Sequence, residues 1–312
     1  MDATTTDIDV VVLSWNRSKE TIDAIESALS QKGPRIRVIV VDQGSHPDQI
    51  AAIEDRWHGD PKLVLRKLPS NLGVPGGRNL GASLGSGRVI VFLDNDAVFA
   101  SSDSCARALE IMDADPGLGA LAFHILNAHT GTTDRTAWNH AQDPSSFAGR
   151  PFLTTRFSGG GCAVRRDAFE ACSGFDPRLE FMEEEKDLGY RFISQGYRIL
   201  HTPDVEILHW SSPEARVDWG DKRLFYLCRN MSYLELKHRS PLPRKVSAFR
   251  NVLRIAQRKG SLLRGVRGLL SGLALGLRCA RRPGWATPLT NEAWRYIDDN
   301  ESRHYGRHSA ED

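Results

Sequence analysis

The sequence lacks paired cysteines and long apolar runs. Its five cysteines are odd in number, widely spaced and never arranged as C-x-x-C, which favours reduced thiols in a cytoplasmic protein over a disulfide framework. The first apolar run, residues 8–13, is too short to span a bilayer and follows an acidic, polar start, so we expect no signal peptide. An apolar content of 40% and a charged content of 26% argue against the disordered and membrane classes for most of the chain.

Acidic residues are absent between Lys237 and Arg282, a stretch that contains 13 lysines and arginines. The whole chain has 41 basic and 39 acidic residues, so the remainder has 28 basic side chains against 39 acidic ones. This asymmetry predicts an acidic body with a basic C-terminal extension. Aromatic residues are also scarce in the stretch, where Phe249 stands alone, and this argues against a base-stacking surface and a nucleic-acid partner.

The basic extension has the periodicity of two helices. In residues 243–260, Val246, Phe249, Leu253 and Ala256 fall on one face, with Arg250, Arg254 and Arg258 away from it. Residues 261–282 have one stripe of Leu262, Val266, Leu269, Leu273 and Leu277, and another of Gly265, Gly268, Gly272 and Gly276. Two interpretations stay open: a helical pair packed on the body with its arginines in water, or peripheral membrane contact through 237–282, where no uncharged stretch is long enough to span.

The first hundred residues alternate between strands and helices. Strands are predicted at 8–13, 35–42, 62–68 and 88–93, with helices at about 18–31 and 47–57 and a Gly-rich loop at 70–86 that runs into a short helix. This order predicts an α/β fold with a mainly parallel sheet flanked by helices. Ligands in such sheets bind at the carboxyl ends of the strands. Further along, residues 181–197 are predicted to form an acid-led helix, and 198–210 two short strands.

Two carboxylates one residue apart follow a predicted buried strand. Val89 to Leu93 are five consecutive apolar residues, a pattern typical of a strand covered on both faces. Asp94 and Asp96 at the end of this strand repel each other and lose hydration, so they need a cation or strong donors nearby. A divalent metal site is one interpretation. The other is turn and helix-cap chemistry, which Asp-Asn-Asp also favours.

Six short motifs in one order resemble the pattern of the family 2 glycosyltransferases, which have the GT-A fold. They are "VVDQGS" at 40–45, "NLGVPGGRN" at 71–79, "LDNDA" at 93–97, "SGGG" at 158–161, "EEKDLGYR" at 184–191 and "HW" at 209–210. The resemblance covers about residues 8–230. It implies a catalytic domain at 1–235, with a nucleotide-sugar part at about 8–100 and an acceptor part at about 101–235, followed by a helical extension at 236–312.

The resemblance implies a nucleotide-sugar site at the first strand ends. Asp42 is expected to accept from the imide N–H of a uracil or thymine base, and a turn-forming aspartate is the alternative. The other residues that it places on the nucleotide or sugar are Asn71, Gly73, Arg78, Asn79, Asp94 and Asn95. Asp96 is expected to bind Mg²⁺ or Mn²⁺ that bridges the diphosphate, and His209 is expected to add a metal or phosphate contact. A histidine that caps a strand edge is the alternative for His209, because imidazole is an unusual ligand of Mg²⁺.

The acidic cluster at 183–187 is expected to supply the general base. The family pattern places the base at Glu185, where this chain has one methylene more than the usual aspartate. Glu184 is the alternative base, because neighbouring carboxylates raise one another's pKa. These acids also suit a helix N-terminus through its dipole. Asp187 and Arg191, four residues apart, are interpreted as a structural pair.

The sequence therefore predicts an inverting, metal-dependent glycosyltransferase of the hexosyltransferase type. It would move a sugar from a UDP- or dTDP-sugar to a hydroxyl acceptor, in the cytoplasm or on the inner face of the membrane. A sugar nucleotidyltransferase is the alternative enzyme, but the loop "SWNRSKE" after the first strand has no glycine to cradle a triphosphate. A second alternative is a non-enzymatic protein that binds nucleic acid or a membrane surface through its basic extension. The intact acidic cluster argues against it, because binding alone would not need these carboxylates.

Overall fold

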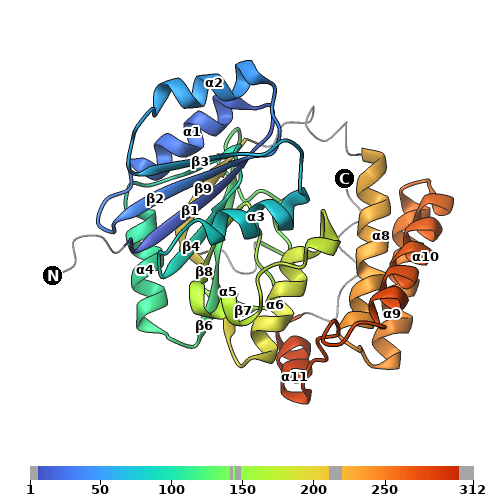
Figure 1. Cartoon of the computed structure of the whole chain (residues 1–312). Coiled ribbons are helices and arrows are strands. Elements are labelled where there is room, and N and C mark those ends of the chain that lie inside the picture. Colours follow the sequence, from blue (N-terminus) through green and yellow to red (C-terminus); the bar gives the residue numbers. More distant parts are fainter. Residues whose placement is uncertain (1–5, 141–142, 145–148, 211–219, 302–312) are drawn as a thin grey trace.

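A nine-stranded mixed sheet forms the centre of the molecule in the computed structural model, which describes residues 6–140, 143–144, 149–210 and 220–301 (Figure 1). The strand order is β3-β2-β1-β4-β8-β6-β9-β5, and β7 pairs with β9. The strands are β1 Ile8–Ser14, β2 Ile36–Asp42, β3 Leu63–Lys67, β4 Val89–Leu93, β5 Ala97–Phe99, β6 Leu118–Asn127, β7 Phe152–Thr154, β8 Gly161–Arg165 and β9 Arg198–His209.

The helices connect these strands or follow them. They are α1 Ser18–Leu29, α2 Pro47–Arg56, α3 Gly73–Ser83, α4 Ser104–Ala114, α5 Arg166–Ala171, α6 Glu184–Ser194, α8 Gly220–Lys237, α9 Leu242–Arg258, α10 Leu262–Cys279 and α11 Asn291–Asn300, with a 3₁₀ turn, η2, at Pro177–Leu179. In the part of the chain that the structure describes, no helix combines the length and the apolar character that crossing a bilayer requires.

The predicted parallel arrangement is confirmed for the first four strands and is incomplete beyond them. β1 pairs in parallel with β2 and β4, and β2 with β3. β8 is antiparallel to both β4 and β6, while β6 and β9 are parallel. The prediction of two short strands at 198–210 is wrong: β9 is a single strand whose pairing with β6 shifts register at Phe123 and His124, next to Pro203, which has no N–H to donate.

Apolar side chains fill both faces of the sheet. One core cluster joins the sheet to α1, α2 and α4, and the other joins it to α3, α5, α6 and α11. Val89 to Leu93 of β4 are at most 2% exposed, as the uninterrupted apolar run predicts. The carboxyl ends of the parallel strands β1, β2 and β4 therefore lie together at one buried edge of the sheet. Polar side chains that follow these strands can reach a common site.

The C-terminal helices pack together at one side of the body (Figure 1). The glycine stripe of α10 is its packing face: a Cβ built at Gly272 would lie 2.0 Å from the carbonyl oxygen of Arg229 in α8, and one at Gly268 would lie 2.6 Å from that of Phe225. Small residues are therefore needed where α10 meets α8. Because the glycine face of α10 packs against α8, part of the leucine stripe remains exposed to solvent, and Leu277 is 66% exposed.

The predicted division between residues 235 and 236 falls inside α8. Lys237 and His238 at the end of this helix are 3% and 1% exposed, and both contact the Asp187 carboxylate of α6, at 2.7 and 3.1 Å. Further on, α11 returns to the body and buries Ala293 and Ile297 in the same core cluster as α6. Buried contacts thus join the extension to the body at both ends.

Candidate functional site

The sheet register brings the predicted carboxylates and His209 together. Leu93 pairs with Gly161, so Asp94 follows directly beside the Gly159–Gly160 turn, and its N–H donates to the Gly160 carbonyl at 3.3 Å. Ala97 pairs with His209, which places the imidazole beside Asp96. His209 Nε2 lies 3.4 Å from Asp96 Oδ1. Residues more than a hundred positions apart in the chain therefore line one edge of the sheet.

Asp96 and His209 are the centre of a small polar network. His209 Nδ1 lies 2.7 Å from Oδ2 of the buried Asp134, and Arg17 donates from Nη1 to Asp96 Oδ2 at 2.7 Å. Burial opposes the charge on both groups, but Asp96 and Asp134 raise the pKa of His209 to about 9. His209 and Arg17 in turn hold the pKa of Asp96 below its ordinary value despite its burial.

The donor atoms of this network fit a divalent cation. Asp96 offers a hard carboxylate oxygen, and His209 would present Nε2 to the same place once a cation displaces its proton. Asp134 holds the other ring nitrogen, the arrangement by which a carboxylate orients a metal-ligating histidine. Within the described ranges no group of three or more His, Cys, Asp or Glu side chains could hold a metal ion. An ion held by Asp96 and His209 would also need oxygen ligands from substrate phosphates or water.

Arg78 joins the donor side of the site to the acidic cluster. It lies in α3 and is 5% exposed. Its Nη1 donates to Glu185 Oε1 at 2.8 Å and lies 3.7 Å from Glu184, while Nη2 donates to Asp94 Oδ1 at 3.2 Å. Burial lowers the pKa of this guanidinium, but Glu185, Asp94 and Glu184 together raise it, so Arg78 stays charged. The prediction that it contacts the nucleotide stays a prediction, and the structure adds its contacts with both candidate bases.

Glu184 and Glu185 have different surroundings. The Glu185 side chain is 19% exposed and also accepts from the N–H of Gly159 at 3.1 Å. Glu184 is 4% exposed at its side chain, and its Oε2 has no hydrogen-bond partner among the described residues. Burial, and then the charge of Glu185, raises the pKa of Glu184 to about 8. At neutral pH Glu184 is therefore mainly protonated.

The pKa of Glu184 predicts how stability depends on pH. Its pKa of about 8 in the folded protein lies above its ordinary value, so the unfolded chain loses this proton at a lower pH than the folded protein does. The free energy of unfolding therefore falls as pH rises from about 4.5 to 8. Glu184→Gln should remove this part of the slope and raise the free energy of unfolding at pH 8 by up to about 4 kcal/mol, because each unit of pKa shift corresponds to about 1.4 kcal/mol. Urea unfolding across this pH range checks it. Glu110→Gln, at a 71% exposed side chain, is the matched control and should leave the slope unchanged.

A strained segment leads into the acidic helix. Glu180, Met182 and Glu183 have positive φ angles of 58°, 71° and 68°, which cost free energy in residues other than glycine and often occur at functional sites. Asn230 of α8 is fully buried, and its Nδ2 lies within 2.8–2.9 Å of three carbonyl oxygens of this segment, those of Leu179, Phe181 and Met182. One amide from the C-terminal helices thus holds the backbone that positions Glu185.

Replacing Asn230 should disturb the site from a distance. In Asn230→Asp the carboxylate faces three carbonyl oxygens, so we expect a loss of about 1–3 kcal/mol of stability. We also expect a fall in kcat of about 10-fold or more with little change in donor KM, since the candidate base, Glu185, is displaced. Urea unfolding and steady-state kinetics well below the melting temperature check this. Asn300→Asp, where Nδ2 donates to Tyr296 within α11, is the control. An unchanged kcat in Asn230→Asp would show that the segment is held by its other contacts.

Asp42 lies at the end of β2 in a turn. It is 2% exposed and accepts from the N–H groups of Gly44 and Ser45, at 3.2 and 3.1 Å, and from the Ser45 hydroxyl. These bonds are the turn chemistry that the sequence left as an alternative. They leave acceptor capacity on the carboxylate, so the contact with a base stays a prediction.

The other predicted nucleotide residues hold the loops around the site. Asn71 Oδ1 accepts from the N–H of Gly73 at 2.7 Å, and Asn95 Nδ2 donates to Thr21 at 3.3 Å. Gly73 has φ +75°, and a Cβ there would lie 2.7 Å from the carbonyl oxygen of Glu180, so the close approach of two loops requires glycine. Asn79 pairs with both backbone groups of Phe175, at 2.8 Å each. Their nucleotide contacts stay predictions.

Three site residues have no signal in the sequence. Arg17 and Asp134 lie in ordinary polar segments, and Asn230 lies within a helix, so only the fold shows their contacts with Asp96, His209 and the 180–183 segment. The predicted structural pair is confirmed: Arg191 donates to Asp187 Oδ2 from Nε at 3.0 Å and from Nη2 at 2.6 Å. A four-residue spacing on one helix is enough to predict such a pair.

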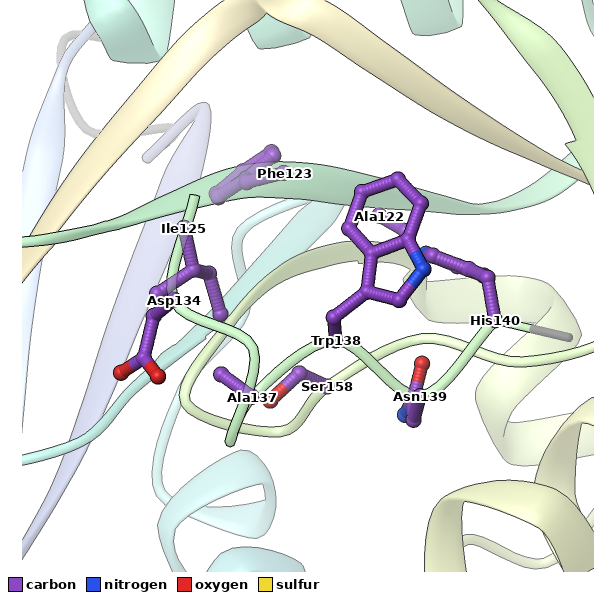
Figure 2. A pocket seen from close by; sticks show the side chains of 9 residues that line it. All are labelled: Ala122, Phe123, Ile125, Asp134, Ala137, Trp138, Asn139, His140 and Ser158. Atoms are coloured by element: carbon purple, nitrogen blue, oxygen red, sulfur yellow. The ribbon is translucent and has the colours of Figure 1, made fainter. Parts of the chain in front are cut away.

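A small pocket borders the site on the side of the predicted acceptor part. Figure 2 shows Trp138 and His140 at one end of it and Asp134 at the other. Ser158, which precedes the glycine that donates to Glu185, also lines it. Asn139 contributes a buried Oδ1 that has no hydrogen-bond partner among the described residues. The pocket therefore lies between Asp134, which contacts the candidate metal ligand His209, and Ser158, which precedes the glycine that contacts the candidate base Glu185.

Comparisons with known proteins identify the family of the chain. The model of the family described as Glycosyl transferase family 2 matches residues 9–172, just over half of the chain. The chain is 25% identical over 231 residues (68% of this chain) to the O-antigen biosynthesis protein RfbC of Myxococcus xanthus, and 24% identical over 296 residues (89% of this chain) to an N-acetylglucosaminyltransferase of Rhizobium meliloti. These matches span 18% and 67% of the relatives' own lengths.

Solved structures show the same fold at low identity. A mannosyltransferase of Pyrobaculum calidifontis, in complex with GDP-Man and Mn²⁺, aligns with a TM-score of 0.63 and 19% identity over 95% of this chain and 84% of its own. GalNAc-T7 with UDP, GalNAc and Mn²⁺ aligns with a TM-score of 0.55 and 16% identity over 90% of this chain and 59% of its own. Both are GT-A glycosyltransferases. The chain therefore belongs to glycosyl transferase family 2 and has the GT-A fold.

Proposed function

We propose that the protein is an inverting, divalent-metal-dependent glycosyltransferase that moves a hexose-type sugar from a UDP- or dTDP-sugar to a hydroxyl acceptor. The observation that carries the proposal is the junction at Arg78, which contacts a candidate base, Glu185, and a donor-side carboxylate, Asp94, at the edge of the sheet that also presents Asp96 and His209. The GDP-Man, UDP and Mn²⁺ of structural neighbours support a nucleotide-sugar donor and a metal.

On the donor side, Asp96 and His209 would hold Mg²⁺ or Mn²⁺, and Asp134 would orient His209. The ion would neutralise charge on the departing nucleoside diphosphate. Asp94, Asn95 and the 71–79 segment would contact the sugar and the nucleotide, and Asp42 would accept from the base. Arg17, now paired with Asp96 at 2.7 Å, lies where it could donate to a phosphate oxygen.

On the acceptor side, Glu185 would remove the proton of the attacking hydroxyl. The N–H groups of Arg78 and Gly159 occupy Oε1 of Glu185, which fixes the carboxylate and leaves Oε2 for the acceptor. The protonated Glu184 adds no second negative charge beside it. We place the acceptor on the side of the pocket lined by Trp138 and Asn139. All five cysteines are unpaired, which supports a reducing, cytoplasmic setting.

A nucleotide-sugar screen tests the proposed function. Melting temperatures would be measured with UDP, dTDP and GDP and their common sugar conjugates, each with Mn²⁺ and with a chelator, because a ligand that binds the folded state raises the melting temperature. We expect a rise with a uridine or thymidine conjugate that requires the metal. A metal-independent rise, or a rise with guanosine nucleotides alone, would contradict the proposed donor class.

A further inference from the structure

A row of exposed leucines runs along the outer face of α10. Leu263, Leu270 and Leu277 are 74%, 57% and 66% exposed, and their seven-residue spacing keeps them on one side of the helix over about 21 Å. Gly265 and Gly272, two positions further on and so nearly opposite, pack against α9 and α8. The leucine row therefore points away from the body, and Figure 1 shows α10 at the edge of the molecule.

Exposed arginines lie beside the leucines in α10 and just after its last residue. Arg267, Arg278 and Arg281 are exposed, and Arg267 lies four residues after Leu263 on the same side of α10. The sequence has no aspartate or glutamate from Lys237 to Arg282, so these helices supply no acidic side chain of their own to neutralise the arginines. Exposed large apolar side chains interleaved with cations are the chemistry of helices that lie in a lipid interface.

We propose that this face, Leu263, Arg267, Leu270, Leu277, Arg278 and Arg281 of the α10 region, docks the protein on an anionic lipid bilayer. The positive charge of this face favours an anionic bilayer over a second copy of the chain. An anionic surface complements the arginines, whereas a second copy would place arginines against arginines. None of the described helices can cross a bilayer, so α10 would lie in the plane of the interface with its leucines among the acyl chains.

Lipid docking does not rest on the proposed function. If both hold, they specify the acceptor class, since an enzyme held at a bilayer suits a hydroxyl acceptor carried on a lipid. The α8 helix, which packs on α10 through the glycines, also supplies Asn230 to the segment before Glu185. Docking would thus fix the helices that position the base.

Vesicle co-sedimentation of the full chain tests the proposal. The probes are vesicles of phosphatidylcholine alone and of phosphatidylcholine with phosphatidylglycerol, each at low and high salt. We expect binding to the anionic vesicles at least about 10-fold tighter than to the neutral ones, and weaker in high salt, because each arginine near an anionic surface contributes and salt screens it. Equal binding to the two kinds of vesicle, or none to either, would overturn the proposal.

Two variants separate the apolar and the charged contributions. The first carries Leu263→Gln, Leu270→Gln and Leu277→Gln, and the second carries Arg267→Glu and Arg281→Glu. Each should bind anionic vesicles at least about 10-fold more weakly than the natural chain, with an unchanged melting temperature because the positions are exposed. The matched control carries Arg56→Glu and Arg107→Glu, the same charge change at exposed arginines of α2 and α4, on other sides of the molecule (Figure 1).

The control distinguishes binding through the α10 face from attraction by the net charge of the whole protein. Retained binding in the control, with binding lost in both variants, supports the α10 face. An equal loss in the control would show that net charge alone attracts the protein, and it would overturn the assignment to α10. Analytical ultracentrifugation without lipid tests whether the face instead binds a second copy of the chain. A dimer that dissociates in the leucine variant would identify the face as a dimer interface and overturn the proposal.

Discussion

Glu185→Gln should lower kcat by about 10² to 10⁴-fold, the usual contribution of a positioned general base, while the donor dissociation constant stays nearly unchanged. Glutamine keeps the size of the side chain, and its carbonyl oxygen can still accept from Arg78 and Gly159. What it loses is the ability to take a proton from the acceptor. Steady-state turnover and calorimetric titration of the donor with its metal measure the two quantities on the same preparation.

Glu184→Gln is the matched control for this prediction. Its side chain is next in sequence and also faces Arg78, but it is buried and mainly protonated at neutral pH. The substitution replaces one neutral group by another, so turnover should change little. A large loss in Glu184→Gln, with Glu185→Gln active, would assign the base to the other glutamate and shift the motif register by one residue.

Asp96→Ala should abolish metal-supported donor binding and leave the fold intact. The carboxylate is the candidate metal ligand with hard oxygens, and its loss leaves His209, held by Asp134, as the remaining candidate ligand. We expect the donor affinity in Mn²⁺ to fall at least about 100-fold, more than the loss of an outer-sphere partner causes. Donor titration and urea unfolding provide the two readouts.

Asp113→Ala is the control for Asp96→Ala, because it removes a half-exposed carboxylate of α4 that pairs with Arg88, at the opposite end of β4 from Asp96. It should leave donor binding unchanged. Transfer at the full rate by the natural protein in excess chelator would contradict the metal role of Asp96, whatever the variants do.

Sequence patterns predicted the strand ends of this fold well, because buried parallel strands leave long apolar runs such as Val89 to Leu93 followed by polar residues. They do not predict the antiparallel insertion of β8, since a short apolar segment has the same composition in either direction. The junction of Arg78 with Glu185 bridges 107 positions. No local periodicity carries information on such a contact, although motif order indicated that both residues belong to one site.

The C-terminal helices show a second limit. Helical periodicity correctly separated a glycine stripe from a leucine stripe in α10, but it does not say which stripe is buried. Hydrophobicity alone favours burial of the leucines, whereas the structure buries the glycines because α8 approaches within contact of the α10 backbone. Only the partner helix decides this, and the same holds for α9, where Val252 is buried while Val246 and Leu253 are each 41% exposed.

The configuration of the transferred sugar tests the central claim most directly. If Glu185 activates the acceptor hydroxyl for a single in-line attack opposite the diphosphate, the product must have the anomeric configuration opposite to that of the donor. Proton NMR of the product, made with the donor that the melting screen identifies, reads this configuration from the anomeric coupling constant. We predict inversion, and retention of the donor's configuration would contradict the account.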